Sequence, residues 1–109
     1  MAKRIGAWNV IHNAIEATAM SEVVDCTGYN ALALYITFSA TQNWTFAIYG
    51  NMATSGAFLP VLINGTALSK QTNASGMIIF KDVPNYVQVL ATEDVNGAAV
   101  TVYAAPVQV

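Results

Sequence analysis

The sequence contains few charged residues. Only 9% of its 109 residues are Asp, Glu, Lys or Arg, and 55% are hydrophobic, whereas a typical soluble domain is about 25% charged. Four basic and six acidic residues give a net charge of −2. They form no cluster of Lys and Arg that could neutralise phosphate groups. This composition argues against nucleic-acid binding.

Charge is missing altogether between Cys26 and Ser69. A membrane-spanning helix needs about 20 mostly apolar residues in a row. Polar and turn-forming pairs interrupt this stretch, for example at residues 42–43, 50–51 and 64–65. We therefore expect no membrane insertion, and a surface of small uncharged side chains that associates readily with other proteins.

Cysteine is almost absent, since Cys26 stands alone. A single cysteine excludes an internal disulfide and with it a disulfide-stapled secreted scaffold. We expect Cys26 to be a small buried hydrophobic residue. The apolar residues after Lys3 and Arg4 are too interrupted for the hydrophobic region of a signal peptide, so we expect the chain to be made and kept in a reducing cytoplasm.

Residues that carry catalysis or bind metals are scarce. The only histidine, His12, has no nucleophile and orienting group beside it in the sequence. One Cys and one His cannot make a zinc site of about four such ligands. Oxygen ligands for calcium could come from Glu93, Asp94 and Asn96, or from Asp82, but ordinary solvated turn residues are the better explanation. We predict no enzyme activity, no catalytic residue, no cofactor and no metal.

The clearest structural pattern lies in residues 31–50. Large apolar side chains alternate along two runs, 32–39 and 44–49, which a short polar segment joins. Period-two alternation indicates β-strands with one buried face, so we expect a core hairpin. The expected inner row is Leu32, Leu34, Ile36, Phe38, Trp44, Phe46 and Ile48; the uncharged outer row is Ala33, Tyr35, Thr37, Thr45, Ala47 and Tyr49.

Further short strands are predicted along the rest of the chain. They fall within residues 14–20, 21–25, 76–83, 86–92 and 98–105, with a turn at 27–30, a long loop at 64–75 and a hairpin turn at 93–97 that contains Asn96-Gly97. Pro60 makes 57–63 an edge or bulged strand. The fold class is all-β: an antiparallel β-sandwich of six to eight short strands, jelly-roll or Ig-like. Residues 1–20 form an N-terminal arm or first strand, and residues 21–109 the sandwich domain.

The outward aromatic and threonine side chains are the candidates for an interface. Tyrosine suits an interface because it buries apolar area and keeps a hydrogen-bonding tip. Packing beneath loops or the arm, or stacking against a sugar, would also explain outward tyrosines. The candidate residues are Trp8, Tyr35, Thr37, Thr45, Tyr49 and Tyr103.

Three segments carry a resemblance to a known family. Residues 24–30 with the strand that follows, residues 82–89, and the closing residues 98–106 resemble small β-sandwich modules of tailed-bacteriophage virions. The resemblance covers residues 22–106 and leaves the arm uncovered, and Cys26 departs from it where a β-branched residue is more usual.

The resemblance implies a non-enzymatic structural protein of the virion, such as a capsid decoration protein or the base of a head fibre. It implies many copies, a homo-oligomer for which we expect a trimer, and contact with the major capsid protein or another virion protein. The alternative is a carbohydrate-binding, lectin-like module that uses exposed tyrosines.

Overall fold

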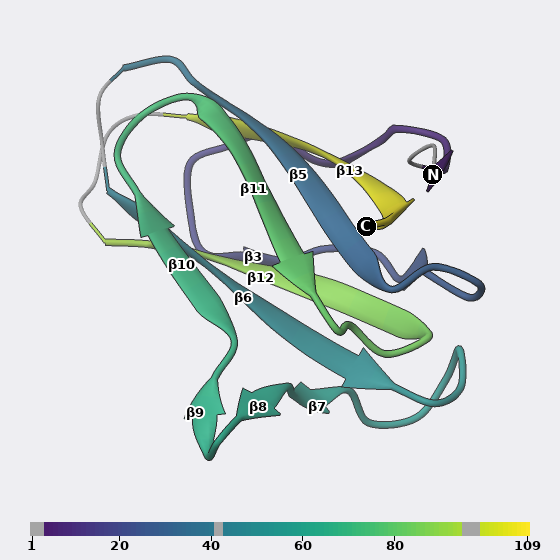
Figure 1. Ribbon diagram of the computed structural model, residues 1–109. Helices are drawn as coiled ribbons and strands as arrows, with labels where there is room; N and C mark the ends of the chain where they lie inside the picture. Colours follow the sequence, from purple (N-terminus) through teal and green to yellow (C-terminus); the bar gives the residue numbers. More distant parts are fainter. Residues whose placement is uncertain (1–3, 41–42, 95–98) are drawn as a thin grey trace.

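The chain folds into two antiparallel β-sheets that face each other. The computed structural model describes residues 4–40, 43–94 and 99–109. The first sheet has the order β1 (Arg4–Ile5), β13 (Val100–Gln108), β5 (Ala31–Phe38) and β11 (Gly76–Lys81), with β2 (Asn9–Ile15) also paired to β13. The second has the order β10 (Ser69–Thr72), β6 (Trp44–Asn51), β12 (Tyr86–Glu93) and β3 (Ala19–Met20), with β4 (Val24–Asp25) on β12 and β7 (Leu59–Pro60) on β6. A small hairpin of β8 (Leu62–Ile63) and β9 (Thr66–Ala67) projects from one end of the sandwich (Figure 1).

This architecture confirms the predicted fold class. In the described ranges all elements are strands, and seven of them have four or more residues, within the expected six to eight. The remaining six are two-residue strands that extend sheet edges or form the small hairpin. No helix in the described ranges is long and apolar enough to span a membrane.

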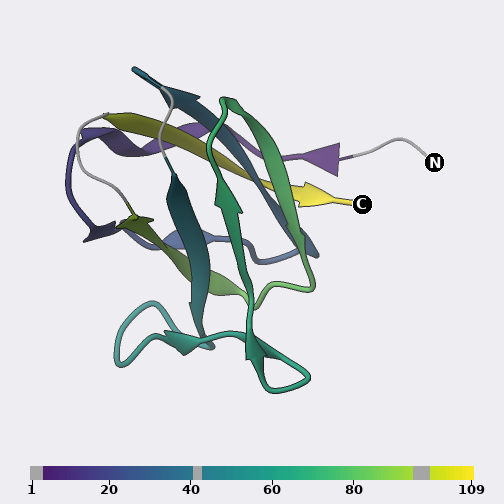
Figure 2. The same cartoon turned by 90° about the vertical axis from the view of Figure 1, so that its left-hand side faces the viewer.

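The expected hairpin of residues 31–50 is wrong, although its inner row is confirmed. β5 pairs with β13 and β11, whereas β6 pairs with β12 and β10. The chain therefore passes from the first sheet to the second between β5 and β6 (Figure 2). The apolar side chains of both strands lie in the core between the sheets. Alternation in the sequence indicates which side of a strand is buried, but it does not indicate which strand is hydrogen-bonded to it. The inner side chains are buried except Phe38, which is half-buried; the buried ones are Leu32, Leu34, Ile36, Trp44, Phe46 and Ile48.

The expected hairpin around residues 93–97 is also wrong. The strands on either side, β12 and β13, belong to different sheets. The Asn96-Gly97 pair on which the prediction rested lies outside the described residues.

The predicted long loop at 64–75 contains two strands, β9 and β10. β10 has the sequence Ser-Lys-Gln-Thr and lies antiparallel to β6, with Ser69 opposite Ala47 and Thr72 opposite Trp44. Backbone pairing stabilises this strand without buried apolar side chains, so hydrophobic periodicity could not reveal it. The edge position expected from Pro60 is confirmed, since β7 pairs only with β6 among the described strands.

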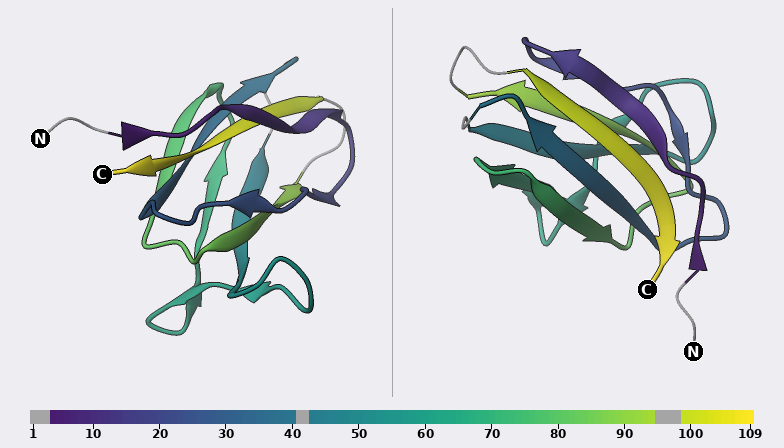
Figure 3. Two further views of the ribbon diagram at one scale, coloured as in Figure 1. Left: turned by 90° about the vertical axis from the view of Figure 1, so that its right-hand side faces the viewer. Right: turned by 90° about the horizontal axis from the view of Figure 1, so that it is seen from above.

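The N-terminal segment, expected as an arm or first strand, contributes to both sheets. β1 and β2 lie against β13, and β3 lies against β12. β1 runs beside the end of β13, so the first and last described strands lie side by side (Figure 3). β2 is irregular, with two register shifts against β13 and a positive φ of 50° at Ala14.

Cys26 is fully buried, as the sequence predicted. Burial, together with the nearby charge of Asp25, raises the pKa of its thiol to about 12. The thiolate is the reactive form of cysteine, so Cys26 is protected in the fold both by its inaccessibility and by its protonation.

We therefore expect Cys26 to resist alkylation in the native protein. Iodoacetamide at pH 8 should leave the folded chain unmodified and modify one site in urea, as measured by intact-protein mass spectrometry. Native labelling at a rate close to that in urea would contradict the burial of this side chain.

His12 is a buried link between the two sheets. Its Nε2–H donates a hydrogen bond of 3.0 Å to the Val89 carbonyl oxygen, so a residue of β2 in the first sheet contacts β12 in the second. The Ser21 N–H donates to the same oxygen at 3.0 Å, and the Ser21 hydroxyl accepts from the Val89 N–H at 2.8 Å. Burial lowers the pKa of His12 below its ordinary value of 6.5, and the bond to Val89 offsets part of this shift. His12 is thus a structural residue, held neutral at physiological pH.

Stability should therefore fall when the solution is acidified below about pH 6.5. The unfolded chain binds a proton at His12 more readily than the folded chain, because the pKa of His12 is lower in the fold. The contribution of His12 to the free energy of unfolding is therefore complete above pH 6.5 and decreases as the pH falls from 6.5 toward the folded pKa. Urea titrations at pH 7.5 and 5.5 would measure this loss. The His12→Gln variant cannot gain the proton and should lose less over the same interval; equal losses in both proteins would contradict the assignment.

Candidate functional site

The outer face of the first sheet is unusually apolar. The strand register places Val10, Tyr103, Tyr35 and Met77 side by side across β2, β13, β5 and β11. Seven large apolar side chains on this side of the sheet are exposed by 37 to 57%. We call them the apolar face; they are Ile5, Trp8, Val10, Tyr35, Met77, Ile79 and Tyr103.

Two tyrosines stand at the centre of the apolar face. The Tyr35 and Tyr103 rings pack edge to face, with their centroids 6.1 Å apart and their planes at 72°. This is a favourable geometry for aromatic rings. Together with Trp8 they line an open hollow of about 360 Å³. Three aromatic side chains thus line one open hollow on this side of the sheet.

Small buried residues form the floor beside these rings. Ala33 lies opposite Ala105, and Ala31 opposite Val107, and all four are at most 2% exposed. Outward positions alternate with core positions along a strand, so these residues share a side with Tyr35 and Tyr103. Lys81, opposite Ala31 at the end of β11, is the one charge that the register places on this side among the described side chains.

The structure divides the predicted interface residues between two opposite surfaces. Trp8, Tyr35 and Tyr103 meet on the apolar face, and Thr37 lies half-buried in the next row, opposite Thr101. The outer row expected from residues 31–50 is therefore not one surface.

Thr45 and Tyr49 lie on the outer face of the second sheet. The Thr45 hydroxyl donates to the Asp94 carboxylate at 2.9 Å, and the Gln71 amide donates to the same oxygen at 2.8 Å. Tyr49 is half-buried between Gln88 and Pro60 on the neighbouring strands. Around Thr45 and Gln71 this surface is polar and internally hydrogen-bonded. Asp94, considered above as a calcium ligand, is engaged there, and its possible co-ligand Asn96 lies outside the described residues.

Sequence reasoning missed four members of the apolar face: Ile5, Val10, Met77 and Ile79. A signal was present in residues 76–81, because Met77 and Ile79 alternate with Ile78 and Phe80, so both sides of that strand are apolar. A strand that is apolar on both sides is typical of burial on both faces. In the monomer the outward side remains exposed.

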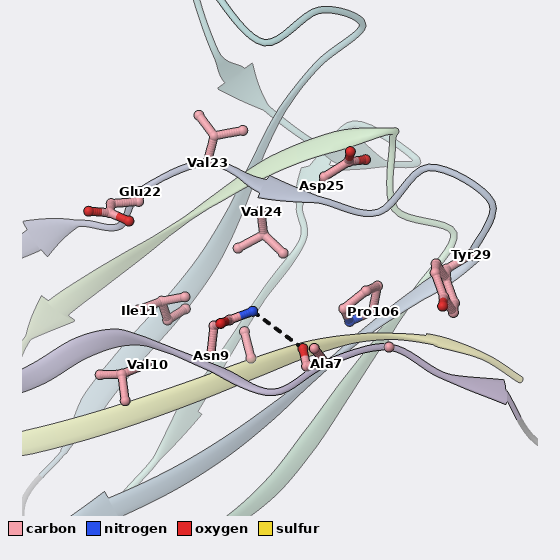
Figure 4. Close-up of a pocket in the computed structure, with 12 residues that line it drawn as sticks. Ala7, Asn9, Val10, Ile11, Glu22, Val23, Val24, Asp25, Tyr29 and Pro106 are labelled. Atoms are coloured by element: carbon pink, nitrogen blue, oxygen red, sulfur yellow. Dashed lines mark hydrogen bonds between the residues drawn. The ribbon is translucent and has the colours of Figure 1, made fainter.

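A second hollow lies between the N-terminal segment and the connection that contains β4. It has a volume of about 450 Å³ and combines apolar residues with polar ones, among them Asn9, Glu22, Asp25 and Tyr29 (Figure 4). The Asp25 carboxylate accepts a hydrogen bond of 2.9 Å from the Thr27 N–H. Hydrogen bonds from the Thr27 side chain and backbone hold the pKa of Asp25 below its ordinary value. No group of three His, Cys, Asp or Glu that could hold a metal occurs in the described part of the chain.

Comparison with known proteins shows the fold and no sequence family. No family model matches the chain, and no curated protein matches it. The crystal structure of the SPBc2 prophage-derived protein YomS superposes with a TM-score of 0.68 at 14% identity, over 99% of this chain and 96% of that one. The periplasmic inhibitor of g-type lysozyme PliG from Aeromonas hydrophila gives a TM-score of only 0.42 at 10% identity, over 98% and 85%. The sandwich, including its N-terminal strands, is thus an arrangement shared with a prophage-derived protein.

Proposed function

We propose that this protein is a non-enzymatic structural component of a bacteriophage particle, of the capsid decoration or head-fibre-base type, and that it acts through protein–protein assembly. The apolar face is the observation that supports this proposal. Monomeric soluble proteins rarely expose contiguous apolar patches larger than a few hundred Å². Seven large apolar side chains, including one tryptophan and two tyrosines, share a side of this sheet, and such residues are enriched at protein interfaces.

Two further observations favour a particle over another setting. The fold is shared over nearly its whole length with a prophage-derived protein, in agreement with the resemblance of residues 22–106 to virion modules. The surface also carries few charges, so closely packed copies repel one another little. In this proposal the protein is made in the host cytoplasm and is located in the virion, in contact with the major capsid protein or another virion protein.

The proposal is tested on particles. Virions produced from the genome that encodes the chain are purified on a density gradient and analysed by quantitative mass spectrometry. We expect the protein to co-purify at a fixed ratio to the major capsid protein. Its complete absence from infectious particles, with the protein present in the producing cells, would rule the proposal out.

The aromatic hollow supports carbohydrate binding as a second candidate function. Trp8, Tyr35 and Tyr103 surround it, and aromatic rings offer a stacking surface for the apolar side of a sugar. A glycan array should then show binding that disappears in Tyr103→Ala and persists in Tyr49→Ala, since Tyr49 lies on the other sheet. Absence of binding across the array would contradict carbohydrate binding, and assembly would then be the one remaining candidate function.

A further inference from the structure

We infer that the partner seated on the apolar face is the same face of a second copy of this chain, related by a two-fold axis. The inference rests on the proposed assembly function and names the partner of that site. Three features carry it: the area of the face, its lack of charge and its occurrence on one side of the sandwich.

The area of the apolar face fits a dimer interface. A large side chain offers roughly 150–250 Å² when fully exposed. The exposed fractions of 37 to 57% at seven positions therefore amount to about 600 Å² of apolar surface. A stable interface buries about 800 Å² on each partner. The apolar face with a rim of its polar neighbours, such as Thr37 and Thr101, reaches that size.

The charge distribution favours a second copy over a charged partner. Lys81 at the margin is the one charge that the register places on this side among the described side chains. Two identical faces therefore meet without like charges at the centre, whereas a strongly charged partner would find nothing to pair with.

A single self-complementary patch closes with two-fold symmetry. Contact between identical patches is isologous and ends at a dimer, whereas a ring of three needs two different patches. The outer face of the second sheet differs in character: Thr45 and Gln71 donate hydrogen bonds to Asp94 there, and among the described residues Met20, 40% exposed, is the exposed large apolar side chain that the register places on it, opposite Leu90.

The shape of the face suggests how the copies lie. The rings of Trp8 and Tyr103 stand toward the β2 side, and the more slender Met77 and Ile79 lie on β11 at the other side. A two-fold axis parallel to the strands lays β11 of each copy over β2 of its partner. Met77 of one copy then packs against Val10 of the other copy, beside the hollow that Trp8, Tyr35 and Tyr103 line. Slender side chains of one copy thus face bulky side chains of the other.

Light scattering coupled to size-exclusion chromatography tests the dimer. We expect a mass of about 23 kDa, twice the 11.6 kDa of the chain. Met77→Lys should weaken dimerisation by about tenfold or more, because an ammonium would be buried without a partner. Met77 is exposed, so the variant should fold, as circular dichroism would check. Ser69→Lys adds the same charge at an exposed position of β10 and should leave the dimer intact.

Cysteine crosslinking tests the orientation. A mixture of Met77→Cys and Val10→Cys chains should form a mixed disulfide dimer, while Met77→Cys alone should not crosslink to itself. Self-crosslinking of Met77→Cys without the mixed product would overturn the proposed axis. The native Cys26 is buried and does not interfere.

Four results separate this inference from the proposed function. A monomer at all concentrations, or a trimer, overturns the two-fold dimer, even where the protein is found in particles. A dimer that Met77→Lys leaves unchanged overturns the use of the apolar face. A dimer that Met77→Lys disrupts sustains the inference, even if the protein is absent from virions and the particle function fails.

Discussion

Replacement of Phe46 by alanine is expected to lower the free energy of unfolding by about 3–5 kcal/mol. Phe46 lies in the middle of β6 and is fully buried in the core between the sheets. Its removal loses the transfer free energy of the ring and leaves a cavity that two rigid sheets cannot close. A small domain has only about 5–15 kcal/mol of total stability, so this change alone brings the chain close to unfolding.

Urea denaturation followed by tryptophan fluorescence would measure this loss. Phe46→Leu retains most of the buried volume and should cost clearly less than the alanine variant. Met52→Ala is the matched control, because Met52 is 88% exposed and its change should stay within about 0.5 kcal/mol. If Phe46→Ala cost no more than Met52→Ala, the packing of β6 against β5 described above would be wrong.

The buried side of each long strand could be predicted from sequence because burial is a local property. Alternation in β5 and β6 assigned residues such as Leu34 and Phe46 to the core, and both are fully buried. Strand pairing could not be predicted in this way. β5 finds its partners in β13 and β11, far along the chain, and the two expected hairpins were wrong because neighbouring strands cross between sheets.

The candidate site was predicted only in part for the same reason. Tyr35 and Tyr103 were chosen as outward residues, but their contact depends on the pairing of β5 with β13. Thr45 and Tyr49 were grouped with Tyr35 because the hairpin was assumed, but β6 belongs to the second sheet, so they lie on the opposite side. Ile5 and Val10 lie in the segment whose strands no periodicity defined.

His12 illustrates a contact that no sequence pattern contains. Its hydrogen bond to the Val89 carbonyl oxygen joins residues 77 positions apart and spans the two sheets. A lone histidine without a nearby nucleophile predicted a non-catalytic role, and this stays a prediction. Its structural role became visible only when β2 and β12 were placed against each other.

The second large effect is expected at Gly50, where the chain has no room for a side chain. A Cβ atom there would overlap the Cγ atom of Pro84 and lie 3.2 Å from Cγ2 of Val61. The proline ring cannot rotate away, and Gly50 is held by pairing with both Leu59 and Val87. Overpacking of this kind costs about 1–3 kcal/mol, so we expect Gly50→Ala to lower the free energy of unfolding by that amount in urea titrations.

Two further variants identify the cause of that loss. Gly76→Ala adds the same methyl group at a strand position with no atom within 4 Å, and it should be neutral or slightly stabilising, because alanine loses less backbone entropy than glycine. Pro84→Ala removes the ring carbon that a Cβ at Gly50 would strike. In that background Gly50→Ala should therefore cost less, and this non-additivity is the signature of direct contact. Additive losses would instead indicate that the backbone at Gly50, rather than the space beside it, requires glycine.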